Sequence, residues 1–381
     1  MTYNLRRDVR DLSAEALAKV EEQGLPAAPM IDPGSAAQAG IPFDYDSEFD
    51  SLANIDRIAD SLRAIGHAVH LVEATDDLPQ WFLEHPVDLV FNIAEGRHGA
   101  YRESQVPAIL ESLHIPYTGS NSVALALALD KAKTKQILAS EGIATPPWQL
   151  FPSPTTRLDP QLEFPLIVKP NREGSSKGIW RESVVGNQAA LSQQVARIYE
   201  RYHQEALVEE FIHGTELTVG IIGEEALPVL EISFTGCQPS GEFFYSWRMK
   251  EFQGNAALGL VPSFHCPARL DAQTTARVQA IAWRAHRALG CVDFSRTDIR
   301  LRPDGTPFVL EVNPLPGLSP LDSNFPLMTA AAGISHQMLI QRIVELAMSR
   351  YCHALPHEPS AACPVAIGRA VPWGETKEVL R

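Results

Sequence analysis

A lysine and a short glycine- and serine-rich segment could together bind phosphate. Lys169 lies near the end of an apolar stretch, FPLIVKP at 164–170, and the segment GSSKG follows at 174–178. The apolar stretch predicts a strand that holds the lysine amine at a fixed height. A loop without bulky side chains can then offer backbone N–H groups and hydroxyls to a phosphate. The alternative is a flexible hairpin tip that carries a surface lysine.

Two carboxylates and an amide form a second candidate site. Asp298 lies in a predicted strand, and Glu311 and Asn313 lie in the next one after a DG turn. Antiparallel pairing across that turn brings Asp298 close to Glu311, and residues two apart share one face of a strand. Three oxygen ligands on one face suit Mg²⁺. The alternative is ion pairing with Arg296 or Arg300.

Two further glutamates could contact a nucleoside. Glu209 and Glu216 stand on either side of a predicted strand and turn in VEEFIHGTE at 208–216. A strand edge can hydrogen-bond a purine through its backbone, while carboxylates accept from an amine or from ribose hydroxyls. Taken alone, two glutamates near a turn are more often a solvated face. A phosphate loop and a magnesium site on the same chain indicate nucleotide chemistry.

The elements that must position these residues fall into three groups. Near the N-terminus, an amphipathic helix at 50–65, a short strand at 67–72 and a buried strand at 87–92 predict helices covering a parallel sheet. One long helix is expected at 122–140, before a TPP linker. The rest predicts a hairpin, then an α+β region of several strands with helices at 273–289 and 333–349.

Composition narrows the function. The chain has 381 residues and a formal net charge of -14, which predicts two or three domains and argues against binding to nucleic acid or anionic membranes. Five cysteines fit a reducing compartment, and no apolar run approaches the roughly 20 residues of a spanning helix. We therefore expect a cytoplasmic protein with no nucleic-acid or membrane partner. Near the C-terminus, Cys352, His353, His357 and Cys363 match no common zinc spacing, so we do not expect zinc there.

In their order and spacing, these pieces resemble the ATP-grasp ligases, and most closely the D-alanine–D-alanine ligase family. The resemblance runs from about residue 87 to 348. The stretches that carry it are IPYTGSNSVALALALDKAKTK (115–135), FPLIVKPNREGSSKGI (164–179), LVEEFIHGTELTV (207–219), SRTDIRLRPDG (295–305) and FVLEVNPLPGLS (308–319).

The resemblance implies an ATP-grasp fold of α/β and α+β class with an N-terminal parallel-sheet domain. It divides the chain into an N-terminal domain at 1–130, a small central subdomain with a lid hairpin at 131–214, a C-terminal subdomain at 215–350 and a tail at 351–381. It also implies a homodimer.

The resemblance assigns roles in binding ATP. The residues implied are Lys131 and Lys169 for the phosphates, Ser175 and Ser176 for the loop that covers them, Glu209, Phe211 and Ile212 for the adenine, and Glu216 for the ribose. Two Mg²⁺ ions would bind Asp298, Glu311 and Asn313.

Three further residues are implied for the reaction. Lys250 matches a lysine near the γ-phosphate, and Arg296 matches the arginine beside the developing oxyanion. The backbone N–H of Gly317 matches one that stabilises the tetrahedral intermediate. The implied activity is ATP-dependent formation of an amide bond, through an acyl phosphate, between a small carboxylate and an amine. The resemblance implies that both are amino acids.

The substrate half departs from the family pattern. Glu95 stands where the family usually has a histidine, and Ala100 where it has a glutamate. The family's serine-leucine pair is replaced by LDSNF at 321–325, in which Ser323 could serve. Trp247 and Glu251 stand where tyrosines are usual, and the family's glycine-rich first turn with its glutamate is not visible in residues 1–60. We expect altered substrate specificity, with these candidates: Glu95, Arg97, Tyr101, Arg102 and Ser323.

Four functions remain open at this point. The first is a ligase of this kind with a changed amino-acid or carboxylate substrate. The second is a true D-alanine–D-alanine ligase of peptidoglycan synthesis. The third is a non-catalytic nucleotide-binding protein, and the fourth is acyl transfer to a thiol or carrier protein.

Overall fold

The N-terminal region contains a small parallel sheet. The computed structural model describes residues 1–6 and 44–354. Strand β1 (Thr2–Tyr3) pairs in parallel with β2 (Val72–Glu73), and isolated parallel bridges join Thr2 to Asn92 and Val90 to Tyr117. The predicted parallel arrangement is confirmed, but its strands are much shorter than expected. The helices that surround it are α3 (Leu52–Ala64), α4 (Leu78–Glu84), α5 (Gln105–Ser112) and α6 (Ser122–Leu129).

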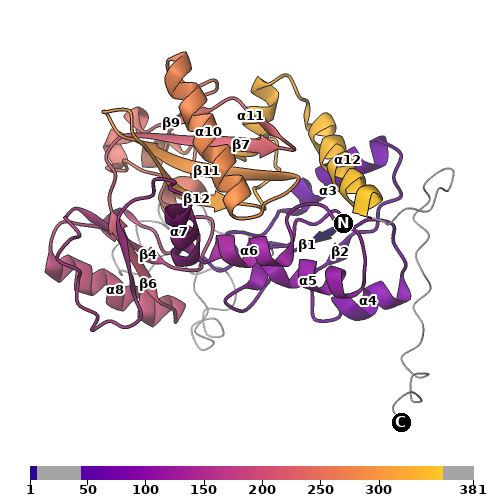
Figure 1. The fold of residues 1–381 in the computed structure, drawn as a ribbon, viewed down its shortest axis with the longest axis horizontal. Helices are drawn as coiled ribbons and strands as arrows, with labels where there is room; N and C mark the ends of the chain where they lie inside the picture. The colour runs from indigo at the N-terminus through magenta and orange to yellow at the C-terminus, as the bar shows by residue number, and fades with distance from the viewer. Residues whose placement is uncertain (7–43, 355–381) are drawn as a thin grey trace, which may run out of the picture.

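Helix α3 follows the predicted apolar spacing and packs against the end of the chain. Ser51 caps it by accepting a hydrogen bond from the backbone N–H of Asn54. Ile55 and Ile58 are fully buried, in one apolar core with side chains of α12 (His336–Ala354). Helices α3 and α12 therefore lie side by side, although they are far apart in sequence (Figure 1).

The prediction of a single long helix at 122–140 is wrong, because the helix is interrupted at Asp130. This residue is extended, ends α6 and caps the start of α7 (Lys131–Ser140). Its carboxylate accepts from Lys133 N at 3.1 Å and from the Asn171 amide at 2.9 Å. Aspartate competes well for this cap position, so two helices replace one. The break makes Lys131 the first residue of a new helix.

A four-stranded sheet follows. Its strand order is β3-β6-β4-β5, and α8 (Gln188–Tyr202) packs on it. The predicted hairpin is confirmed by the antiparallel pairing of Leu166 with Val185, although a 3₁₀ turn shortens its second strand. The strands are β3 (Trp148–Phe151), β4 (Leu166–Pro170), β5 (Val184–Val185) and β6 (Ala206–Glu210).

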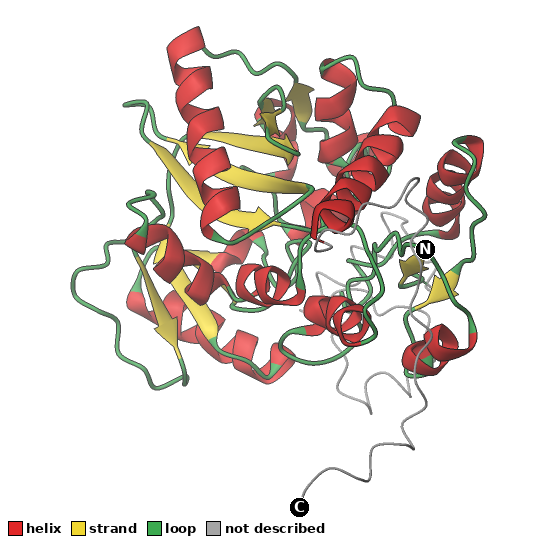
Figure 2. Ribbon diagram, turned by 45° about the vertical axis from the view of Figure 1, so that its right-hand side comes forward, coloured by secondary structure: helices red, strands yellow, loops and turns green. Residues whose placement is uncertain are grey.

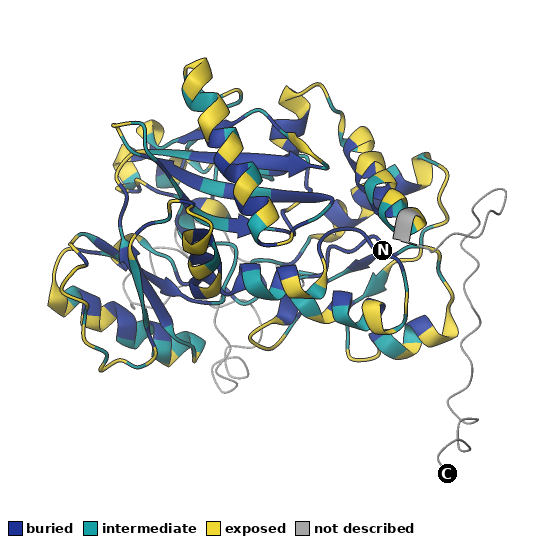
Figure 3. Ribbon diagram, in the orientation of Figure 1, coloured by how far each residue is buried: buried dark blue, intermediate teal, exposed yellow. Residues whose placement is uncertain are grey.

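A larger antiparallel sheet forms the C-terminal part. Its order is β10-β9-β7-β11-β12, with β8 paired to β7, and Figure 2 shows it beside the four-stranded sheet. Helix α10 (Ala272–Ala288) buries one face against it and exposes the other (Figure 3). The strands are β7 (Thr215–Ile222), β8 (Glu225–Ala226), β9 (Leu230–Ser233), β10 (Ser263–His265), β11 (Phe294–Leu301) and β12 (Pro307–Asn313). The remaining helices are α9 (Trp247–Glu251) and α11 (Asn324–Ala331).

Several expectations concern parts of the chain that the structure describes only partly. Cys352 belongs to α12, whereas His357 and Cys363 lie outside the described residues. In the described ranges, no helix has the length and apolarity that crossing a membrane requires. The proposed domain boundaries remain a prediction.

The buried His286 makes stability depend on pH. Burial lowers its pKa from 6.5 to about 4, and its Nδ1 lies 2.7 Å from the hydroxyl of Ser295. Between these two values the unfolded chain binds the proton and the folded chain does not, so stability falls as pH drops from 6.5 to 4. Between pH 7 and 4.5 the wild type should lose on the order of 2–3 kcal/mol more unfolding free energy than His286→Asn. Urea unfolding at both pH values measures this, and parallel pH profiles would refute it.

Candidate active site

A buried glutamate lies between two lysines at the start of the site. Lys169 projects from β4 and pairs with Glu209 on the neighbouring strand β6. Lys135 from α7 reaches the other carboxylate oxygen at 2.7 Å and also donates to the Thr145 hydroxyl at 2.7 Å. Burial opposes ionisation of Glu209, but the two ammonium groups hold its pKa below the usual value. Sequence reasoning assigned no role to Lys135, because only the fold brings it to Glu209.

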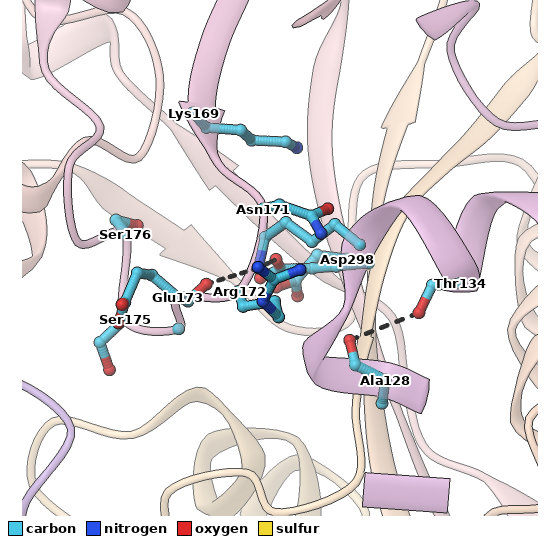
Figure 4. A network of polar contacts seen from close by, with 12 residues as sticks. Ala128, Thr134, Lys169, Asn171, Arg172, Glu173, Ser175, Ser176 and Asp298 are labelled. Carbon is cyan, nitrogen blue, oxygen red and sulfur yellow. Dashed lines mark hydrogen bonds and ion pairs between the residues drawn. The ribbon is translucent and has the colours of Figure 1, made fainter. Parts of the chain in front are cut away.

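The glycine- and serine-rich loop has a left-handed backbone. Ser175 and Ser176 have φ values of 48° and 56°. The Ser176 hydroxyl donates to the Tyr245 carbonyl at 3.0 Å, and Lys250 Nζ donates to Ser175 Oγ at 3.0 Å. The loop therefore contacts the segment that carries Lys250. Figure 4 shows both serines on the loop that follows Arg172, with Lys169 nearby.

The two predicted magnesium carboxylates are direct partners across the sheet. Asp298 on β11 is in register with Glu311 on β12, which confirms the pairing expected from the DG turn. Asp298 pairs with Arg296 at 2.8 Å, and Glu311 pairs with Lys131 at 3.3 Å. Partial burial opposes ionisation of Glu311, but Lys131 and other nearby cations lower its pKa to about 2. One alternative raised above, pairing with Arg296, is therefore also found.

The donor set fits a hard cation. Asp298 and Glu311 supply adjacent carboxylates, and the Asn313 side-chain oxygen accepts from Leu315 N at 2.9 Å. No three His, Cys, Asp or Glu side chains within residues 1–6 and 44–354 are grouped as a metal site. Magnesium commonly takes one or two carboxylates and completes its shell with phosphate and water, so two carboxylates are enough.

The end of the site around Phe211 is apolar with one ion pair. Phe211 is buried and packs edge-on against Phe244, with the Arg300 guanidinium 5.4 Å above its ring. Arg300 pairs with Glu216 at 2.6 Å. An aromatic and aliphatic wall with a carboxylate at its edge suits a flat heterocycle attached to a sugar.

One cavity collects most of the predicted residues. The chain contributes to its walls from both large sheets, the glycine- and serine-rich loop and the segments around Lys250 and Gly317. The predicted residues that line it are Lys169, Ser175, Ser176, Glu209, Phe211, Ile212, Glu216, Lys250, Arg296, Asp298, Glu311, Gly317 and Ser323. Lys131 and Asn313 are not in its wall, although Lys131 reaches Glu311.

Comparisons with known proteins agree with this geometry. The family model described as D-ala D-ala ligase C-terminus matches residues 137–345. A D-alanine–D-alanine ligase of Anaeromyxobacter sp. is 36% identical over 292 residues, which cover 75% of this chain and 88% of that protein. The chain belongs to the D-alanine–D-alanine ligase family.

Two further comparisons extend this result. The uncharacterized protein y4sG of Sinorhizobium fredii is 35% identical over 310 residues, which cover 77% of this chain and 88% of that protein. The solved structure of D-alanine–D-alanine ligase from Bacillus anthracis complexed with ATP superposes with a TM-score of 0.64 at 27% identity. The superposed region covers 79% of this chain and 93% of the Bacillus anthracis chain. The chain is thus an ATP-dependent ligase of the carbon–nitrogen bond-forming type.

The substrate candidates of this ligase lie in two places. Ser323 stands at the N-cap position of α11 without a side-chain cap hydrogen bond, and it lines the main cavity, where a Cβ on Gly317 would come within 2.7 Å of its hydroxyl. Arg97 and Arg102 instead line a second cavity on the other side of the loop. Arg102 is buried and ion-paired with two glutamates. This geometry favours a role in holding the loop rather than in contacting the substrate.

Two other candidates differ in exposure. Tyr101 is largely exposed. Glu95 is partly buried, and desolvation together with the neighbouring Glu103 and Glu48 raises its pKa well above the usual value. The substrate roles of these residues remain predictions.

Sequence reasoning missed a group of residues behind the loop. Glu48 and Lys177 are buried and ion-paired at 2.8 Å, and Asp44 accepts from the Tyr202 hydroxyl at 2.6 Å. The acidic stretch DSEFD at 46–50 was the only signal available. Nothing in that stretch indicates the loop at 174–178 as its partner, because the contacts span more than 120 residues.

Removal of Lys135 should destabilise the ligase strongly. In Lys135→Met, Glu209 loses one of its two buried partners, and breaking a buried pair costs about 3 kcal/mol or more. The matched control is Lys133→Met on the same helix, whose exposed amine donates to Gln136 and whose loss should cost less than about 0.5 kcal/mol. Urea unfolding of both variants provides the measurement. Equal effects would contradict the structural role given to Lys135.

Proposed function

We propose that this ligase activates a small carboxylate as an acyl phosphate and joins it to an amine, with at least one substrate other than D-alanine. The observation that carries the proposal is the convergence of Lys169, Lys250 and Arg296 on a cavity that also contains Asp298 and Glu311. The three cations are suited to bind phosphate, and the two carboxylates are suited to bind a metal ion. Both groups line the same cavity. That combination matches the demands of phosphoryl transfer from ATP.

The chemistry requires positioning more than a protein nucleophile. An oxygen of the substrate carboxylate attacks the γ-phosphorus of ATP, and ADP leaves. The amine nitrogen then attacks the acyl carbon, the bond from that carbon to the phosphate oxygen breaks, and the amine proton passes to solvent. Lys169 and Lys250 neutralise phosphate charge, and Arg296 faces the oxyanion that develops on the acyl oxygen.

Magnesium would be held by Asp298, Glu311 and Asn313, where it would neutralise phosphate charge. In the structure these carboxylates already pair with cations, Arg296 and Lys131. If these carboxylates held a metal ion, Arg296 and Lys131 would become available to negatively charged groups. We infer that ATP and the metal ion bind cooperatively for this reason.

The changed substrate is supported by the residues at the acceptor end. Glu95 replaces a histidine usual in the family, so a carboxyl group whose pKa is raised by burial stands where an imidazole is usual. Glu251, which stands at a usual tyrosine position, pairs with Arg6 of the N-terminal strand region. Both replacements change the polar groups that these segments offer, and such differences discriminate between small polar substrates.

Loss of a metal carboxylate should strongly reduce turnover while the fold remains. Glu311→Gln keeps the shape but removes the charge, and the loss of one such group should lower phosphate release by about 10²–10³-fold. Lys169→Ala should have a similar effect. The control Glu225→Gln lies on the exposed strand β8 and should retain wild-type turnover. Phosphate release with an active substrate pair provides the measurement, and turnover retained in Glu311→Gln would contradict the magnesium assignment.

A substrate panel tests the altered specificity directly. D- and L-amino acids, singly and in pairs, are supplied with Mg·ATP, and products are identified by mass spectrometry. We expect a product that contains an amino acid or small acid other than D-alanine. Efficient formation of D-alanyl-D-alanine from D-alanine alone would favour a ligase of peptidoglycan synthesis. ATP binding without turnover on any pair would favour a nucleotide-binding protein.

A further inference from the structure

The loop that covers the ATP site is attached at its rear to a distant acidic segment. Gly174 and Gly178 bracket the loop, and each donates its backbone N–H to a buried carboxylate. Gly174 N donates to Glu48 Oε1 at 2.7 Å, and Gly178 N donates to Asp44 Oδ2 at 2.9 Å. The backbone N–H groups of the loop were candidates for phosphate binding. In the structure these two donate hydrogen bonds to carboxylates instead.

The contact with Glu48 depends on glycine. A Cβ at Gly174 would lie 2.5 Å from Glu48 Oε1, which is far inside contact distance. The φ of Gly174 lies outside the left-handed region, so alanine would be tolerated by the backbone. Glycine is therefore needed at position 174 because a side chain there would prevent the close approach of the Glu48 carboxylate.

Charge holds Glu48 in place. Arg102 donates to both of its carboxylate oxygens, and Lys177 from the loop approaches at 2.8 Å. Burial opposes ionisation of Glu48, but the guanidinium and the ammonium group hold its pKa below the usual value. Glu48 is thus a charged acceptor that binds the loop through both its backbone and its lysine.

The front of the same loop faces the ATP cavity. Ser175 and Ser176 line that cavity, whereas Glu173 and Lys177 line the second cavity behind the loop. Both serines are left-handed, a conformation that costs free energy and persists only where surrounding contacts impose it. The contacts with Glu48 and Asp44 bracket these two residues.

We propose that Glu48 is a positioning residue that holds the loop at 174–178 over the ATP phosphates. The carboxylate acts through Gly174 and Lys177 and does not touch the nucleotide. The proposal rests on the proposed function, because it assumes that the cavity in front of the loop binds ATP.

The test combines two changes on opposite sides of one contact. Glu48→Gln removes the charge, and Gly174→Ala pushes the carboxylate away. Loss of one charge-assisted hydrogen bond should raise the dissociation constant of Mg·ATP about tenfold in each variant. Because both changes break the same contact, the double variant should also be about tenfold weaker, not about a hundredfold. Isothermal titration of the full-length protein with a non-hydrolysable ATP analogue and Mg²⁺ measures binding without turnover.

A second readout reports the loop itself. Trypsin cleaves after lysine and arginine, and the loop region contains Arg172 and Lys177. Cleavage at these residues should be faster in both variants than in the wild type, and saturating nucleotide should slow it. A merely structural role would not give cleavage confined to the loop.

The matched control is Asp293→Asn. Asp293 is also a buried carboxylate that accepts a glycine N–H, from Gly119 at 2.8 Å, and pairs with an arginine, Arg350, at 2.8 Å. It belongs to neither cavity, so its variant should bind nucleotide normally whatever its thermal stability.

The outcomes separate the two proposals. Unchanged affinity and unchanged cleavage in Glu48→Gln would overturn the positioning role, as would additive effects in the double variant. If the wild type binds no nucleotide, the proposed function fails. Trypsin cleavage of the nucleotide-free variants then still decides whether Glu48 holds the loop.

Discussion

The structure depends on the pairing of cations with carboxylates around one cavity. Lys169 and Lys135 share Glu209, Arg296 pairs with Asp298, and other pairs surround them. Desolvating any of these charges alone would cost several kcal/mol, so each is placed only where an opposite charge compensates it. This explains how a chain of net charge -14 gathers cations at one place. The surrounding acids make the site possible before any ligand arrives.

Local patterns predicted what depends on local sequence. The apolar spacing of α3 was sufficient to predict that helix. The DG turn between β11 and β12 was sufficient to predict that Asp298 lies opposite Glu311. The apolar stretch at 164–170 also placed Lys169 correctly near the end of β4. Such features can be predicted because residues close in sequence determine them. The family resemblance then implied roles for these residues that spacing alone could not.

The rest required contacts between distant segments. The helix break at Asp130 is stabilised by Asn171, forty-one residues away, and no periodicity in the helix indicates it. Lys135 has the same residue type as its exposed neighbour Lys133, yet only the fold shows that Lys135 is buried. Glu48 was visible as part of an acidic stretch, but its partner Gly174 was not. Long-range electrostatic pairs leave no periodic signature in sequence.

The packing of α3 on α12 has a consequence for biosynthesis. The apolar face of α3, with Ile55 and Ile58, shares its core with Leu339 and Ile343 near the other end of the described chain. A ribosome makes α3, which ends at Ala64, long before α12, which begins at His336, and chains generally begin to fold from the N-terminus during synthesis. The core around α3 therefore stays incomplete until α12 has been made, and the apolar face of α3 remains uncovered in the interval.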